Sequence, residues 1–333
     1  MNPPASSATK APHPLVLYGL IGVMVACWTF NFIFGKVGLR YLDPLTMASF
    51  RVVLAAAILV PIYLATASLG SARDKRRLNS ANPEGAGKTR FSRRDLWKFA
   101  QLGLYGVALN QTLFTIGLFH TTAGHSSLII GSGPIFILLL ARAQGLESIK
   151  AKKLVGMALA FGGVAVLAAE HGLSLRAGTL RGDLITLVGS LAFALYTVVG
   201  KKVARLYDSV ALNCFTFLAG ATLLLPLAVR QALRLDWGAV AWQGWAALFY
   251  MAAFGSVTAY LIYYWALRYL AASRLAAFGY VHPVIVTTLG VLALGERVTA
   301  HLLVGGPMVL LGVYLTELHP EENGDKNINT NLE

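Results

Sequence analysis

Long apolar stretches alternate with short polar segments along most of this 333-residue chain. A helix that crosses a bilayer needs about 17 to 25 mostly apolar residues. Ten stretches meet that requirement, so the pattern predicts an all-α integral membrane protein with ten transmembrane helices. The expected spans are Leu15–Val37, Leu45–Ala65, Leu96–Phe119, Ala123–Leu140, Lys153–Ala169, Leu184–Val203, Ser209–Ala228, Trp242–Leu267, Ala271–Leu294 and Leu302–Leu318.

Composition and charge agree with that interpretation. Hydrophobic residues make up 56% of the chain and charged residues only 13%, against about 25% charged in soluble domains. If both termini are cytoplasmic, most of the 28 Lys and Arg residues fall in cytoplasmic loops and tails, as the positive-inside rule requires. Membrane orientation therefore explains the net charge of +13, and we expect no nucleic-acid partner. The expected location is the inner (plasma) membrane, as a multi-pass protein.

A weak internal repeat divides the chain into two halves. One offset aligns Lys36 with Lys201 and Asp43 with Asp208, and a second offset aligns Gly106 with Gly255. Because each half holds five spans, the second half enters the membrane from the opposite side, as two inverted five-helix repeats. The expected segments are a cytoplasmic tail (1–14), a first repeat (15–169, with a basic cytoplasmic loop at 67–95), a second repeat (182–318) and a cytoplasmic tail (319–333).

Two proline stretches lie at corresponding positions of these halves. Gly131–Pro134 and Gly279–Pro283 each place a proline inside an apolar run, where it removes a helical hydrogen bond. Paired interruptions of this kind point to a transporter binding site. We expect roles in helix kinking or gating for Pro134, Pro283, Arg51, Glu147 and Glu296. Arg51, inside the second span, either anchors the helix at the interface or orients an anionic group of a substrate.

Several polar and aromatic residues share helix faces within the spans. Trp28 and Asn31 are spaced i, i+3, and Gln111 and Thr115 are spaced i, i+4, so each pair lies on one face. Such residues serve either interhelical hydrogen bonds and aromatic belts or the wall of a cavity. Taken together they favour a cavity that takes neutral, zwitterionic or weakly anionic organic molecules. The candidate substrate-binding residues are Trp28, Asn31, Gln111, Thr115, His125, Tyr196, Tyr260, Tyr264, Tyr280 and His282.

The paired motifs resemble two EamA domains of the drug/metabolite transporter superfamily. The resemblance covers about residues 15–318, and it implies a ten-helix permease of a class that includes exporters of amino acids and other small metabolites. It rests on these segments: Trp28-x-x-Asn31, Gly35-Lys36, Phe50-Arg51, Pro134 followed by Gly145-Leu146-Glu147, and Pro283 followed by Gly295-Glu296-Arg297.

The expected function is a secondary transporter, an exporter of small organic metabolites that works by alternating access. The alternatives are a membrane-embedded enzyme, which would need a nucleophile–base set or metal ligands, and a non-transporting sensor or scaffold. Neither catalytic nor metal-binding spacing is present, so we expect no enzyme, no cofactor and no metal. Only His125 and His282 are candidates for a proton relay inside the spans, which leaves proton-coupled and facilitative transport both open. The protein is expected to be a monomer or a homodimer in the lipid bilayer.

Overall fold

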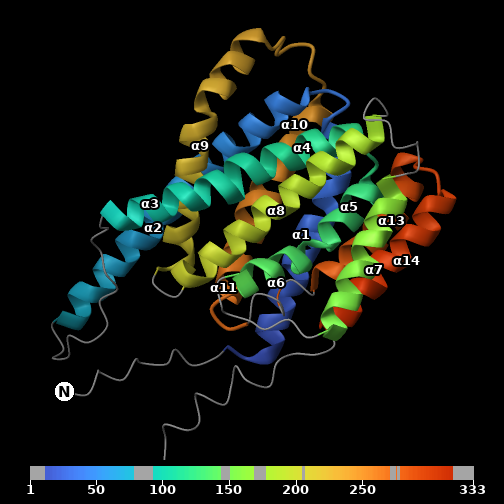
Figure 1. The fold of residues 1–333 in the computed structure, drawn as a ribbon. Coiled ribbons are helices and arrows are strands. Elements are labelled where there is room, and N and C mark those ends of the chain that lie inside the picture. The colour runs from blue at the N-terminus through green and yellow to red at the C-terminus, as the bar shows by residue number, and fades with distance from the viewer. Residues whose placement is uncertain are drawn as a thin grey trace, which may run out of the picture.

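The computed structural model describes residues 12–78, 93–143, 151–168, 178–204, 207–270, 275 and 278–317. Every element within these residues is helical, and the helices pack into one elongated bundle (Figure 1). The first half contains α1 (Pro14–Gly38), α2 (Pro44–Leu78), α3 (Arg93–Leu102), η1 (Gly103–Leu109), α4 (Asn110–His120), α5 (Ala123–Gly131), α6 (Gly133–Ala143) and α7 (Ala151–Ala168). The second contains α8 (Gly178–Ala204), α9 (Ser209–Arg234), α10 (Trp242–Tyr250), η2 (Met251–Thr258), α11 (Ala259–Ala266), η3 (Phe278–Tyr280), α13 (Val281–Leu294) and α14 (Ala300–Glu317).

Seven helical stretches in the described residues are long and apolar enough to cross a membrane, which makes this a multi-pass membrane protein. Three shorter apolar helices lie where the remaining three spans were expected, so the count of ten stays a prediction. The seven are Pro14–Gly38, Pro44–Ser68, Asp95–His120, Ala123–Leu140, Thr179–Lys201, Ser209–Arg234 and Trp242–Ala266; the three are Leu154–Leu167, Val281–Leu294 and Ala300–Gly312.

Two helices begin in the same way in the two halves. The Asp43 carboxylate accepts hydrogen bonds from Leu45 N at 3.0 Å and Thr46 N at 3.1 Å at the start of α2. The Asp208 carboxylate accepts one from Val210 N at 2.9 Å at the start of α9. Aspartate is a favoured cap because the first amides of a helix have no partner within the helix. The sequence offset that aligns these two aspartates therefore aligns two helix starts.

Two helix boundaries differ from the expected spans. The α2 helix continues to Leu78, so the first part of the expected loop at 67–95 is helical. The α8 helix begins at Gly178 instead of Leu184, and Asp183 is therefore part of the helix. A search for apolar runs stops at a charged residue, whereas helical hydrogen bonding continues through it. Most of the 67–95 loop, Glu147 and nearly all of both tails lie outside the described residues.

The two proline stretches interrupt their helices and contact each other. Ser132 separates α5 from α6, which places Pro134 second in α6. The 3₁₀ turn η3 precedes α13, so Pro283 and its neighbour His282 lie in the first turn of a new α-helix. Proline is tolerated there because the first amides of a helix lack intrahelical partners. A Cβ atom on Gly131 would lie 3.2 Å from Pro283 Cγ, so the two breaks meet inside the bundle.

The η1 and η2 segments are π-helical, and they contain the two glycines that the second offset aligns. A Cβ atom on Gly106 would overlap the ring of Tyr196, and one on Gly255 would overlap the amide of Asn31. The first offset aligns Asn31 with Tyr196. The same close contact therefore occurs twice, with different partners. Single-turn π segments are frequent at functional sites.

Glycines bring α7 and α14 into backbone contact at one flank of the bundle, opposite the flank formed by α2 and α9 (Figure 1). A Cβ atom on Gly163 would lie 2.7 Å from Gly305 O, and one on Gly305 would lie 2.8 Å from Gly163 O. Small residues allow helices in a membrane to approach this closely. The helices between these flanks surround the interior of the bundle.

Candidate functional site

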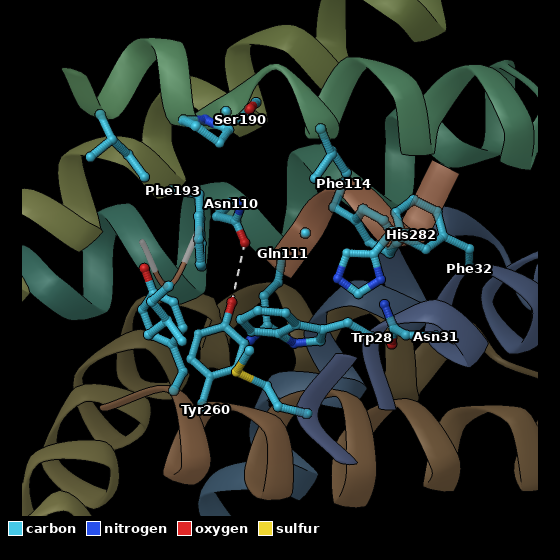
Figure 2. A pocket seen from close by; sticks show the side chains of 18 of the residues that line it. Trp28, Asn31, Phe32, Asn110, Gln111, Phe114, Ser190, Phe193, Tyr260 and His282 are labelled. Carbon is cyan, nitrogen blue, oxygen red and sulfur yellow. Dashed lines mark hydrogen bonds between the residues drawn. The ribbon is translucent and has the colours of Figure 1, made fainter. Parts of the chain in front are cut away.

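A cavity of about 130 Å³ lies in the interior of the bundle (Figure 2). This volume has room for on the order of ten water molecules or one small organic molecule. Side chains from α1, α2, α4, α6, α8, α11 and α13 line it, together with the segment that leads into α13. The lining residues are Met24, Trp28, Asn31, Phe32, Arg51, Asn110, Gln111, Phe114, Ile130, Gly133, Pro134, Ile137, Ser190, Phe193, Tyr260, Tyr263, Leu275, Gly279 and His282.

Aromatic rings form one wall of the cavity around Trp28. The Trp28 ring lies 5.8 Å from the Tyr260 ring, in an edge-to-face arrangement, and 5.5 Å from the Tyr263 ring. Phe193 adds a second edge-to-face contact at 5.9 Å. Trp28 Nε1 donates a hydrogen bond to Gly255 O in η2 at 3.1 Å. These contacts leave the wall rigid and apolar, with its polar atoms satisfied.

Tyr260 connects the two π-helical regions across the cavity. Its hydroxyl lies 3.2 Å from both Gly106 O of η1 and Asn110 Oδ1 of α4, and it donates to one of them at a time. Figure 2 shows the bond to Asn110. Both acceptors come from the first half of the chain and the phenol from the second, so movement between the halves would change this contact.

Arg51 is a cation in the cavity wall with only 3% of its surface exposed. Arg51 Nε donates to Ser256 Oγ at 2.8 Å, and Ser256 Oγ donates to Gln111 Oε1 at 3.0 Å. The guanidinium lies 5.8 Å from the ring centre of Phe114. Arg51 Nη1 has no hydrogen-bond partner, and no salt bridge to Arg51 occurs among the described residues. The charge is therefore held in place but not neutralised by those residues.

Two further side chains present single polar atoms at the cavity. Asn31 Oδ1 is buried and accepts no hydrogen bond. His282 Nδ1 lies 2.8 Å from Thr29 Oγ1, and Thr29 Oγ1 donates to Val25 O. Because that hydroxyl proton is already used, His282 Nδ1 carries the proton and donates to Thr29. His282 Nε2 is then left as an acceptor.

Some candidate residues do not line the cavity. Thr115 donates to Gln111 O in its own helix, and Tyr196 and Tyr264 are fully buried against neighbouring rings. His125 contacts Asp183 instead. The side chain of Tyr280 lies outside the described residues, as does Glu147. Helical spacing showed which residues share a face, but it did not show whether that face meets the cavity or another helix.

The structure adds lining residues that the sequence analysis did not select, among them Phe193, Tyr263, Asn110 and Ser190. For Phe193 a signal exists, because the offset that aligns Lys36 with Lys201 also aligns Trp28 with Phe193. Tyr263 lies beside the stripe of Ser256, Tyr260 and Tyr264, and its place depends on how α11 is rotated.

One end of the bundle, here called the Lys36 end, is closed. Lys36 Nζ donates to Thr121 O, and the Glu296 carboxylate accepts from Ala123 N at 2.6 Å and Gly124 N at 3.2 Å. Glu296 thus occupies the N-terminus of α5, where the helix dipole favours a negative charge. Apolar side chains fill the space between this end and the cavity, with the Phe32 and Phe114 rings 5.2 Å apart.

The opposite end, the Lys201 end, repeats the lysine contact. Lys201 Nζ donates to Leu267 O at 2.6 Å and to Leu270 O at 2.5 Å. The first offset aligns Lys36 with Lys201, and the second aligns Thr121 with Leu270. A lysine therefore binds the carbonyl of the same repeat position at each end.

Comparison with known proteins identifies the family. The model of the EamA-like transporter family matches residues 16–169 and 180–318, which is most of the chain. The chain belongs to the EamA-like transporter family.

Relatives of this EamA chain carry transporter names. It is 29% identical over 300 residues to an uncharacterized transporter of Archaeoglobus fulgidus, covering 89% of this chain and 96% of the relative. It is 26% identical to an uncharacterized inner membrane transporter of Escherichia coli strain K12, covering 92% and 94%. A protein of Streptantibioticus cattleyicolor named a probable terminal-alkyne amino-acid exporter is 28% identical over 236 residues, covering 71% and 77%.

A solved crystal structure that shares 16% sequence identity aligns with a TM-score of 0.62, covering 91% of this chain and 98% of that one. At that identity the likeness concerns the fold. Together with the family match, these comparisons make the EamA protein a membrane transporter of small molecules and not an enzyme. Among the described residues, no group of three or more His, Cys, Asp or Glu side chains could hold a metal ion.

Proposed function

We propose that this protein is a secondary transporter that exports amino acids or related amphipathic metabolites by alternating access about the cavity. Arg51 is the observation that carries the proposal. An arginine inside a membrane span costs about 2.5–3.5 kcal/mol or more unless its charge is paired. A substrate carboxylate would supply that pairing, and a guanidinium binds carboxylates with two parallel hydrogen bonds.

Asn31 supports a substrate that also carries an ammonium group. A Cβ atom on Gly255 would overlap Asn31 Oδ1 and lie 3.4 Å from Arg51 Nη2, so the acceptor and the cation are neighbours. An α-amino acid presents a carboxylate and an ammonium at similarly short separation. Its side chain would then lie against the rings of Trp28 and Tyr260. The exporter name of the Streptantibioticus cattleyicolor relative fits this assignment.

The paired contacts support two inverted five-helix halves and ten spans. They are the lysine contacts at the two ends, the two π-helical glycines, the two aspartate caps, and family matches at 16–169 and 180–318. Inverted halves can exchange conformations, so that a closed Lys36 end becomes an open one while the Lys201 end closes. The distribution of Lys and Arg places the Lys201 end and both termini in the cytoplasm, with the protein in the inner membrane.

Exchange transport in liposomes tests this function. Purified protein would be loaded with unlabelled L-phenylalanine, and entry of labelled L-phenylalanine would be measured. The matched compounds are phenethylamine, which lacks the carboxylate, and 3-phenylpropionate, which lacks the ammonium. We expect exchange of L-phenylalanine and little exchange of phenethylamine. L-Leucine and L-threonine complete the panel, and failure to exchange all three amino acids would contradict the proposal.

Variants test the role of the cavity wall in the same assay. Arg51→Gln should abolish amino-acid exchange, whereas Arg230→Gln, at an exposed position of α9, should leave it unchanged. Trp28→Ala, Gln111→Ala and Tyr260→Ala should also abolish exchange while the protein still inserts and folds. Persistence of exchange in all of these cavity variants would show that the substrate binds elsewhere.

A further inference from the structure

A second buried polar cluster lies at the Lys36 end, away from the cavity. Asp183 and His125 each have 2% of their surface exposed. Asp183 Oδ1 accepts a hydrogen bond from Thr121 Oγ1 at 2.5 Å, and Asp183 Oδ2 lies 3.3 Å from His125 Nδ1. An acid and an imidazole buried together inside a membrane protein share one proton more readily than they carry two charges. Intramembrane pairs of this kind are typical of proton pathways.

The cluster joins elements that would separate if the Lys36 end opened. Thr121 and His125 belong to the connection between α4 and α5, while Asp183 belongs to α8. The same connection is bound by Lys36 of α1 and by Glu296 beyond α13. Opening of this end would therefore expose the cluster to water on that side of the membrane.

A line of hydroxyl groups leads from the cluster toward the cavity. Asp183, Thr186 and Ser190 are spaced i, i+3 and i+7 on α8, so they share one face of the helix. All three are buried, and Ser190 lines the cavity. In the conformation closed at the Lys36 end, the cluster thus has a polar connection to the cavity through its own helix.

The charged and titratable groups around the cluster come from several elements. They include Lys36 of α1, bonded to Thr121 O, and Glu296, bonded to the first amides of α5. His120 ends α4, Arg181 is exposed on α8, and His301 lies in the first turn of α14. Lys36 and Glu296 interact electrostatically with each other. The local balance of charge near the cluster therefore leaves one proton to be gained or lost at His125 and Asp183.

The cluster has no counterpart in the second half of the repeat. The first offset aligns Asp183 with Tyr18, and the second aligns Thr121 with Leu270 and His125 with Arg274. A contact needed merely to close a five-helix unit would be expected in both halves, as the lysine contacts are. The acid–imidazole pair is instead specific to one side of the membrane, as a site that distinguishes the two sides must be.

We propose that His125 and Asp183 form the binding site for the proton that drives export. The inference rests on the proposed function, to which it adds the coupling ion. With the Lys36 end open, the pair takes up one proton from the outer side. With that end closed, the pair releases the proton along Thr186 and Ser190 to the cavity and the cytoplasm. No bond other than those to this proton forms or breaks, and one proton enters as substrate leaves.

Proton movement and substrate exchange can be measured separately in the same liposomes. A trapped pH-sensitive dye would report protons moving against an L-phenylalanine gradient, and L-phenylalanine exchange at equal pH would report the carrier itself. His125→Gln and Asp183→Asn should reduce proton movement to that of protein-free vesicles while exchange continues. His301→Gln, the control histidine at the same end, should keep both activities.

Two results would overturn the proton site while leaving the transporter intact. One is exchange by the unaltered protein without proton movement, and the other is undiminished proton movement in both variants. If a variant fails to fold, Thr121→Val removes a hydrogen bond to Asp183 without removing a titratable group. It should shift the pH dependence of proton movement, and an unshifted profile would contradict the assignment.

A titration that requires no transport separates failure of this site from failure of the proposed function. Detergent-solubilised protein would be titrated between about pH 5 and pH 8, the range in which histidine changes charge. The unaltered protein should take up one more proton per chain than the variant carrying His125→Gln and Asp183→Asn. Equal uptake would rule out the site even if no amino acid in the panel is exchanged.

Discussion

The two ends of the bundle share one contact and differ in the groups around it. Lys36 binds the carbonyl of Thr121, and Lys201 binds the carbonyl of Leu270, at positions that the repeat aligns. At the Lys36 end, Glu296 and the Asp183–His125 pair add carboxylates and an imidazole. In the described part of the Lys201 end, Arg268 adds hydrogen bonds to the carbonyls of Ala204 and Tyr207. Shared contacts hold each half in its fold, whereas unshared ones allow the ends to respond differently.

The largest expected effect comes from removing Glu296, the carboxylate that only the Lys36 end uses in the described residues. Glu296→Ala leaves the first amides of α5 without their acceptor, and a hydrogen bond to a charged group contributes about 1.5–3 kcal/mol. The open form of this end should therefore become roughly tenfold or more populated. The measurement is the labelling rate of Leu118→Cys, a buried position near Lys36, by a membrane-impermeant maleimide.

The matched control for that experiment is Lys201→Met in the same background, with Cys27→Ala and Cys214→Ala. Loss of the lysine contact at the Lys201 end should leave the labelling rate at the Lys36 end unchanged or lower. The comparison between the ends fails if Lys201→Met increases labelling and Glu296→Ala does not.

An intermediate effect is expected at the two aligned glycines. Gly106→Ala would force a methyl group into the fully buried ring of Tyr196, and overpacking of this kind costs about 1–3 kcal/mol. Gly255→Ala should cost less of the free energy of unfolding, because Asn31 is smaller and its side chain can turn into the cavity. Unfolding of both variants in mixed detergent measures the difference. Equal losses would mean that the nature of the partner is irrelevant.

The smallest effect is expected where the halves are most alike. Asp43→Ala and Asp208→Ala each remove a helix cap, at a cost of about 1 kcal/mol. Asp43 also accepts a bond from the Thr46 hydroxyl, so its replacement should cost slightly more. The same unfolding assay applies. A large loss for Asp208→Ala alone would show that the two helix starts are not equivalent in energy.

Much of this architecture could be predicted from the sequence because apolar length and repeat offsets are local properties. The offset that aligned Asp43 with Asp208 also aligned two helix caps, and the offset through Gly106 and Gly255 located two π-helical segments. The windows identified the helices but set the start of α8 at Leu184. A charged Asp183 lowers the hydropathy of its window, yet burial beside His125 satisfies it.

Other features depend on tertiary structure, which one sequence does not reveal. Tyr264 and Tyr260 share a helix face by spacing, but only Tyr260 lines the cavity because neighbouring rings cover Tyr264. Glu296 was expected to take part in gating, and its binding to the α5 amides depends on how α13 and α5 approach each other. That role stays a prediction. The π-helical register of η1 and η2 likewise depends on the close approach of Tyr196 and Asn31.

The two glycine contacts also bear on how such a chain could arise. In a dimer of two identical five-helix chains, symmetry would require the same partner for both glycines, because each surface meets its own copy. A fused chain is free of that requirement. One glycine packs against a phenol and the other against an amide, so each half can change its half of the cavity without copying the change to the other. Joining two copies end to end thus permits an asymmetric binding site inside a symmetric frame.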